Sequence, residues 1–268
     1  MPDDEISSQL IVDKLSDKAL LRNACEFGIL HRALVVRHLW DTMPDAHDAN
    51  RLRSVALELT ANYVASLEDA VLWFFVLKEW KSGGQGLFDL LDGIQVTESA
   101  TGKYSTLVAL DSIRAWTIAD LRREFGLPSD EYLLNNGWSD AGVNTHINSM
   151  REALDRLKEG MELRAGDEGV LRTSYNKIKH GCVAIAATEY SGIGVSVMMS
   201  SRRGPMGENG KRLINTGWLP CDRSELKKLA YSTLVIVEAV CTILNLLYTV
   251  KFDSEWRPPQ WPVPALAE

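Results

Sequence analysis

The sequence predicts a mainly α protein, a helical bundle with one inserted β-hairpin. Apolar residues recur at three- and four-residue intervals over long stretches, and residues 48–81 contain no glycine or proline. Alternating β-branched residues occur only around residues 182–200. With 268 residues, 46% of them hydrophobic, the chain can form one large core, and its composition excludes disordered and collagen-like classes. We therefore treat residues 1–268 as a single helical domain.

Two helices are expected in the N-terminal part, residues 9–82. Ser16 is a candidate N-cap for the first, whose apolar positions run at helical intervals as far as Trp40. The second covers residues 48–81 and is ended by the glycines that follow. Because its second half is apolar nearly all round, we expect that half to be buried.

A glycine-containing segment, residues 83–104, predicts a loop with one short apolar turn. A helical core should follow over residues 105–252. Its expected helices are residues 106–125, a short piece after Ser129, residues 143–164, residues 167–180, and a last apolar helix capped by Asp222.

The β-hairpin is expected at residues 182–200, with its turn at Ser191-Gly192. Residues 202–218 are expected to form a loop before the last helix. The chain ends in a proline-containing tail, residues 253–268.

Residues 229–250 are long and apolar enough to cross a bilayer. However, Glu238, Thr242, Asn245 and Thr249 form one polar stripe on this helix. A glutamate at a bilayer centre is costly, so a core helix of a soluble bundle is favoured over a membrane span.

The four cysteines are scattered without a CxxC pair, which is typical of reduced thiols, and the first residues are acidic rather than signal-like. We therefore expect a cytoplasmic protein with no membrane association. Neither HExxH nor a Cys/His cluster at zinc spacing nor GxSxG occurs, so no metal and no cofactor are expected. The segment from Gly204 to Lys211 resembles a phosphate-binding loop only superficially, because its spacing is wrong.

One predicted helix carries a chemically suggestive stripe. Arg172, Asn176 and His180 are spaced i, i+4, i+8, and Lys179 borders them, while Tyr175 belongs to the neighbouring apolar stripe. A guanidinium, an amide and an imidazole on one edge suit a phosphate group, and histidine transfers protons near neutral pH. The alternative is an ordinary helix end, because basic residues favour the C-terminal dipole and Gly181 is a common terminator.

The charge distribution favours the first interpretation. The formal net charge of −7 divides into +6 over residues 170–228, from ten basic and four acidic residues, and −13 over the rest. Lys177, Lys179, Arg202 and Arg203 lie in the positive part and are candidate binding residues.

The residues Tyr175-Asn176-Lys177-Ile178-Lys179-His180-Gly181, closing a late helix, resemble the HEPN superfamily of small helical-bundle proteins found in RNA-targeting toxins and phage-defence systems. The resemblance implies a bundle of four or five helices that often forms homodimers. It also implies a composite, metal-independent RNase site in which the ribose 2′-OH attacks the adjacent phosphate. On this chain His180 would be the acid/base and Asn176 its polar partner, with Arg172 as the arginine.

Seven residues separate Arg172 from His180, one more than the family pattern has. The alternative is therefore a non-catalytic module that binds a nucleotide or a protein partner, or dimerises. Arg32 and His38 do have the family's spacing, but they lie about 120° apart on an apolar helix, and we interpret that match as chance.

Glu68 and Asp69 interrupt the apolar run of the second helix. A half-buried carboxylate needs a cationic partner, either any basic residue in an internal salt bridge or, more specifically, His180 or Arg172 across the bundle.

Overall fold

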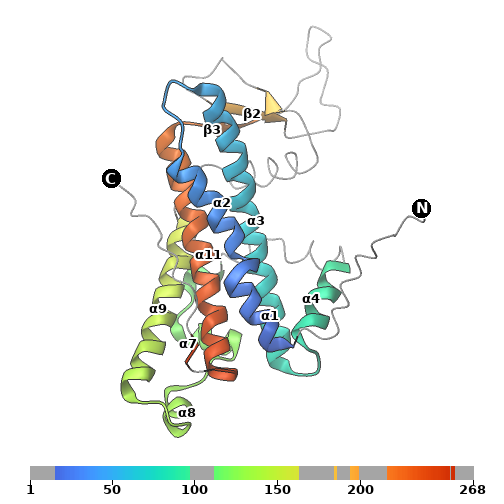
Figure 1. Ribbon diagram of the computed structural model, residues 1–268, viewed down its shortest axis with the longest axis vertical. Helices are drawn as coiled ribbons and strands as arrows, with labels where there is room; N and C mark the ends of the chain where they lie inside the picture. Colours follow the sequence, from blue (N-terminus) through green and yellow to red (C-terminus); the bar gives the residue numbers. More distant parts are fainter. Residues whose placement is uncertain are drawn as a thin grey trace, which may run out of the picture.

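The computed structural model describes residues 16–96, 112–162, 184–185, 194–198, 216–253 and 255–256. Within these ranges the protein is mainly α-helical with a small antiparallel sheet, which confirms the predicted fold class. Figure 1 shows long helices side by side, with the strands β2 and β3 near one end of the bundle.

The first predicted helix is divided by one wide turn. Ser16 accepts a hydrogen bond from the Ala19 amide (3.3 Å) and begins α1, Asp17–Asn23. A π-helical turn, η1 (Ala24–Gly28), then precedes α2, Leu30–Asp41. The Ile29 amide donates to the Ala24 carbonyl at 3.2 Å, so the turn contains one extra residue. Simple 3.6-residue periodicity does not predict such a turn.

Helix α3, Ala49–Ser82, matches the second predicted helix closely. Asp48 accepts from the Arg51 amide (3.2 Å) at its start, and Gly83, with φ +82°, ends it. From Thr60 onward most of its residues are buried, as its apolar second half predicted.

A ten-residue helix, α4 (Leu87–Val96), occupies much of the segment predicted as a loop. One carboxylate explains its start: Asp17 accepts from the Leu87 amide (2.8 Å) and from Trp80 Nε1 (2.9 Å). Leu87 is fully buried. The long-range contacts to Asp17 are invisible in the local sequence, which shows only the flanking glycines.

The middle of the chain forms η2 (Ser112–Ala115), α7 (Ile118–Phe125), α8 (Asp130–Asn135) and α9 (Asp140–Glu162). The start of the helix predicted over residues 106–125 lies outside the described residues; within residues 112–125 it is not continuous, because Thr117 and Asp120 form a capping box that begins α7. Ser129 caps α8 as expected, and α9 agrees with the helix predicted from residue 143.

The sheet has the strand order β1 (Ala184–Ile185), β2 (Gly194–Met198) and β3 (Thr216–Pro220). β1 and β2 pair antiparallel and confirm the hairpin. β3 corrects the prediction of a loop as far as residue 218, since Thr216 pairs with Met198 and Trp218 with Ser196. A Cβ on Gly194 would collide with the Trp218 ring, so glycine lets the indole lie flat against β2.

The last helix, α11 (Arg223–Lys251), is the centre of the bundle. Asp222 caps it by accepting from the Glu225 amide (3.0 Å), and α9, α3 and α2 pack around it (Figure 1). The crossing with α9 is close, because a Cβ on Gly160 would lie only 2.6 Å from Ile236 Cγ1. Although α11 is long and apolar enough for a membrane span, 78% of its apolar window is buried inside the bundle, as expected of a core helix.

Candidate functional site

A group of polar and charged side chains joins α9 to α11. Arg156 Nη1 donates to Tyr231 Oη (3.1 Å) and lies 3.3 Å from Glu159 Oε2, while Tyr231 Oη donates to Glu159 Oε1 (2.8 Å). Arg156 Nε also lies 3.5 Å from Glu238 Oε2. We call these four residues the α9–α11 ion network.

Burial shifts the pKa values of two members of this network. Burial raises the pKa of Glu238, and the attraction of Arg156 opposes that shift while Glu152 and Glu159 add to it. Burial and the hydrogen bond to Glu159 also raise the pKa of Tyr231. The network links α9 to α11 through Arg156 and Tyr231.

The polar stripe predicted on α11 is present, and two of its four residues bond within the helix, whereas the side-chain oxygen of Asn245 is buried without a hydrogen-bond partner among the described residues. Thr242 donates to the Glu238 carbonyl (2.9 Å) and Thr249 to the Leu246 carbonyl (3.1 Å). Only Glu238 reaches another helix among the described contacts, and its partner Arg156 was not predicted. The local sequence does not single Arg156 out, because α9 also carries Arg151 and Lys158.

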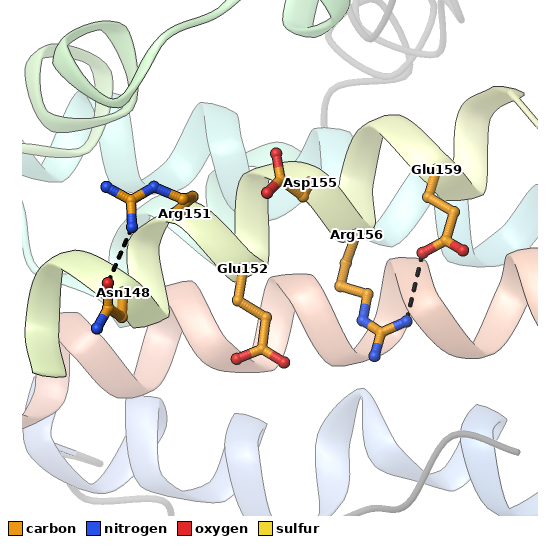
Figure 2. Close-up of a pocket in the computed structure, with 6 residues that line it drawn as sticks. All are labelled: Asn148, Arg151, Glu152, Asp155, Arg156 and Glu159. Atoms are coloured by element: carbon orange, nitrogen blue, oxygen red, sulfur yellow. Dashed lines mark hydrogen bonds and ion pairs between the residues drawn. The ribbon is translucent and has the colours of Figure 1, made fainter. Parts of the chain in front are cut away.

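A shallow pocket of about 410 Å³ lies beside the network. Its lining comes from α9 alone: Asn148, Arg151, Glu152, Asp155, Arg156 and Glu159. Figure 2 shows Glu152 and Arg156 pointing toward α11 and Asp155 pointing away, with Arg151 bonded to Asn148 (2.9 Å). Because a single helix forms this surface and its arginines are paired within it, it offers no convergent set of groups to a substrate.

Burial shifts the pKa values of described core histidine and cysteine side chains away from the values that catalysis at neutral pH requires. His146 is 3% exposed, and burial, followed by the nearby Arg122 charge, lowers its pKa to about 4. Burial raises the pKa of Cys221 to about 11 and that of Cys241 to about 12. At neutral pH the imidazole is uncharged and both thiols are protonated, so they serve packing.

No group of three or more His, Cys, Asp or Glu side chains in the described ranges is arranged to hold a metal ion.

The candidate catalytic and binding residues lie outside the described residues. They are Arg172, Tyr175, Asn176, Lys177, Lys179, His180, Arg202 and Arg203. The two candidate orienting carboxylates, in contrast, lie on α3.

Asp69 Oδ2 lies 2.5 Å from Arg32 Nε on α2, and both side chains are about one-quarter exposed, at 27% and 25%. This is an internal salt bridge to a basic residue other than Arg172 or His180, which was the simpler of the two alternatives for this carboxylate. Arg32 is thereby engaged within the bundle, which agrees with interpreting its spacing to His38 as chance. Glu68 is half-buried beside this pair.

The register of the sheet determines where the chain enters and leaves it. Ala184, the first residue of β1, pairs with Val197 near the end of β2, and Thr216, the first residue of β3, pairs with Met198. Residues 183, 199 and 215 are therefore attached to the same end of the sheet. We call this the entry end; the opposite end leads through Cys221 into α11.

Comparison with protein-family models, with curated proteins and with solved structures found no match to this chain.

Proposed function

We propose that this protein is an RNA-directed, HEPN-like module whose 172–180 segment is a metal-independent endoribonuclease site acting in defence or toxin biology. The observation that supports this most is the sheet register. It attaches both the His180 segment and the basic loop to the entry end.

Only a few residues separate the candidate site residues from the strands. His180 precedes Ala184 by four residues, and Arg202 follows Met198 by four, so each is tethered within about 14 Å of chain from the entry end. Lys211 and Arg212 are similarly close before Thr216. His180 and Arg202 are more than twenty residues apart in the sequence, but both are tethered to the entry end of the sheet. This supports one basic surface around the 172–180 segment.

The chemistry follows from the residue types. His180 would accept the proton of a ribose 2′-OH as that oxygen bonds to the adjacent phosphorus; the P–O5′ bond would break, and the leaving 5′-oxygen would take a proton from water. Arg172 would stabilise the charge on the phosphate, and Asn176 would orient the phosphate or a ribose hydroxyl. Lys177, Lys179, Arg202 and Arg203 would bind the backbone, and Tyr175 would pack beneath them.

Two groups in the described part of the chain, His146 and the α9–α11 ion network, are poor candidates for catalysis. His146 is neutral and buried, and the α9–α11 ion network is paired internally. The functional chemistry is therefore assigned to the entry end of the sheet rather than to the bundle.

A cleavage assay tests the proposal. Purified protein should cleave single-stranded RNA in the presence of EDTA, and His180→Ala should reduce the rate by about 100-fold or more. His47→Ala is the matched control, because His47 is an exposed histidine between α2 and α3. Circular dichroism should show the same helix content for all three proteins.

Cleavage that persists in His180→Ala, or that requires a divalent metal, would contradict the catalytic assignment. If RNA binds but is never cleaved, the second candidate applies: a non-catalytic module that binds a nucleotide or a protein partner. The seven-residue gap between Arg172 and His180 favours this candidate, as does the engagement of Asp69 by Arg32 rather than by a catalytic group.

A further inference from the structure

A second pocket, of about 270 Å³, lies where the end of α11 meets α8 and the turn that follows α8. Tyr132, Asn136 and Trp138 line it on one side, and residues 249–253 line it on the other. Figure 1 shows α8 at the end of the bundle opposite the strands β2 and β3, so this pocket is separate from the entry end of the sheet. We call it the α8–α11 pocket.

The α11 side of the pocket carries unpaired carbonyl oxygens. A helix leaves its last carbonyls without intrahelical donors, and the C-terminal end of its dipole is negative. The carbonyl of Tyr248 is satisfied, because it accepts from the amides of Phe252 (2.9 Å) and Asp253 (3.4 Å). Among the described contacts, no donor reaches the carbonyls of residues 249–251. Three residues that line the pocket therefore bring acceptors without donors.

Asp253 adds a full negative charge at the same place. Its Oδ1 accepts from the amide of Glu255 (3.1 Å) and from that of Trp256 (3.2 Å), and these bonds hold the carboxylate at the end of α11. Both bonds come from neutral backbone groups, so the carboxylate keeps its charge.

The cations near Asp253 are engaged elsewhere. Lys251 also lines the pocket, but its ammonium lies over the Trp80 ring, 3.8 Å from the centroid. Arg22 is close enough to interact with Asp253 electrostatically, yet its ion pair is with Glu26 (2.7 Å). Within the described part of the chain, no cation forms an ion pair with Asp253, so the pocket attracts positive charge.

Two aromatic side chains form the α8 side of the pocket. Gly137, with φ +83°, turns the chain after α8, and the Trp138 amide then donates to the Leu133 carbonyl (3.1 Å). The Trp138 ring is held at its inner side by an edge-on contact with His146, at a centroid distance of 5.7 Å. Tyr132 is 55% exposed. Aromatic rings attract cations, and tryptophan and tyrosine are the strongest of them.

Unpaired acceptors, one carboxylate and two aromatic rings suit a small organic cation. A primary ammonium group donates three hydrogen bonds, and the alkyl chain attached to it packs on aromatic rings. We propose that the α8–α11 pocket binds a primary alkylammonium group, with the ammonium at Asp253 and the alkyl chain against Trp138. A free alkyl diamine and a lysine side chain share this group. Because so few atoms are bound, Kd should be on the order of 1 mM.

Titration of the full chain with 1,4-diaminobutane, followed by nuclear magnetic resonance of the tryptophan indole N–H groups, tests the proposal. Trp138→Phe identifies the signal of Trp138 by its loss. In the wild type this signal should shift and saturate. Asp253→Asn keeps an acceptor for the two backbone amides but removes the charge, and it should raise Kd by about tenfold. Asp155→Asn is the matched control, because it removes the same charge from an exposed position on α9 that points away from α11 (Figure 2), and it should leave Kd unchanged.

Two further probes define what the pocket recognises. Nα-acetyl-lysine amide should also shift the Trp138 signal, and the tighter binder of the two amines identifies the source of the ammonium group as a free diamine or a lysine side chain. 1-Butanol has the same alkyl chain without the charge and should not bind at about 20 mM.

No saturable shift of the Trp138 signal with about 20 mM of either amine would overturn the proposal. An equal rise in Kd for Asp253→Asn and Asp155→Asn would also overturn it, because the amines would then follow the net charge of the protein. Binding of 1-butanol as tight as that of the diamine would show that the pocket does not recognise an ammonium group.

Discussion

The helical bundle and the small sheet differ in how many buried contacts hold them together. In the bundle, α11 is buried along most of its length by α9, α3 and α2, and the charged side chains that enter it are paired. The sheet has short strands and depends on a few contacts: the Trp218 ring over Gly194, and Arg53 Nε of α3 donating to the Gly194 carbonyl (3.1 Å). The difference teaches that most of the buried core lies in the bundle, whereas the sheet depends on few contacts with it.

The largest loss of stability is expected from a substitution in the bundle, at the crossing of α9 and α11. A side chain at Gly160 would meet Val235, Ile236 and the Ser232 carbonyl within 3.0 Å, and the backbone oxygen cannot move aside. Gly160→Val should lower the free energy of unfolding by about 3 kcal/mol or more, measured by chemical denaturation.

Gly93→Ala on α4 is the control for that substitution. A Cβ there has nothing within 4 Å, and alanine favours helix more than glycine does, so stability should be unchanged or rise by about 0.5–1 kcal/mol. Similar losses in both variants would contradict a close α9–α11 crossing.

The next largest effect is a loss of stability at acid pH that depends on His146. The unfolded chain binds a proton on this histidine near pH 6.5, but the folded chain binds it only near pH 4, so stability falls as pH decreases through that window. Between pH 7 and pH 4 the wild type should lose about 3 kcal/mol more than His146→Gln does. His47→Gln, at an exposed position, should follow the wild type; parallel pH profiles for wild type and His146→Gln would argue against a neutral, buried imidazole.

A smaller and local effect is expected at the sheet. Gly194→Ala would push the Trp218 ring away from β2, at a cost of about 1–3 kcal/mol. Hydrogen exchange should accelerate for the amides of β2 and for those of residues 216–219 in β3, while α9 and α11 keep their protection. Equal acceleration throughout would mean that bundle and sheet unfold as one unit.

The smallest effect belongs to the ion pair of Arg32 and Asp69. Because both side chains are partly exposed, Asp69→Ala should cost about 1 kcal/mol. A double-mutant cycle with Arg32→Ala should give a coupling energy of about 0.5–1 kcal/mol. No measurable coupling would show that the carboxylate has another role.

The sequence predicts the long elements of the bundle well, because helical periodicity and caps are local signals. Ser16 and Asp222 cap helices as predicted, and Asp48 and Ser129 cap the two helices whose starts were predicted at those positions. Elements that depend on distant contacts were missed: α4 begins on the Asp17 carboxylate, and β3 forms by pairing with β2. Local composition contains neither of these partners.

The candidate site is less predictable because it, too, depends on contacts between residues far apart in the sequence. Residue types in the 172–180 segment suggest the chemistry, but only strand pairing shows that this segment and the basic loop attach to one end of the sheet. The polar stripe on α11 was visible in the sequence, yet its partner Arg156 lies on another helix.

RNA binding as a function of salt tests most directly whether function belongs to the entry end of the sheet. Arg202→Ala/Arg203→Ala should weaken binding of a single-stranded RNA and reduce the slope of log K against log salt by about 1.4, the contribution of two phosphate contacts. Arg22→Ala/Arg151→Ala removes the same charge from exposed positions on α1 and α9, and should leave the slope nearly unchanged. Equal reductions for the two double variants would contradict a localised site, since they would mean that RNA binds through net charge alone.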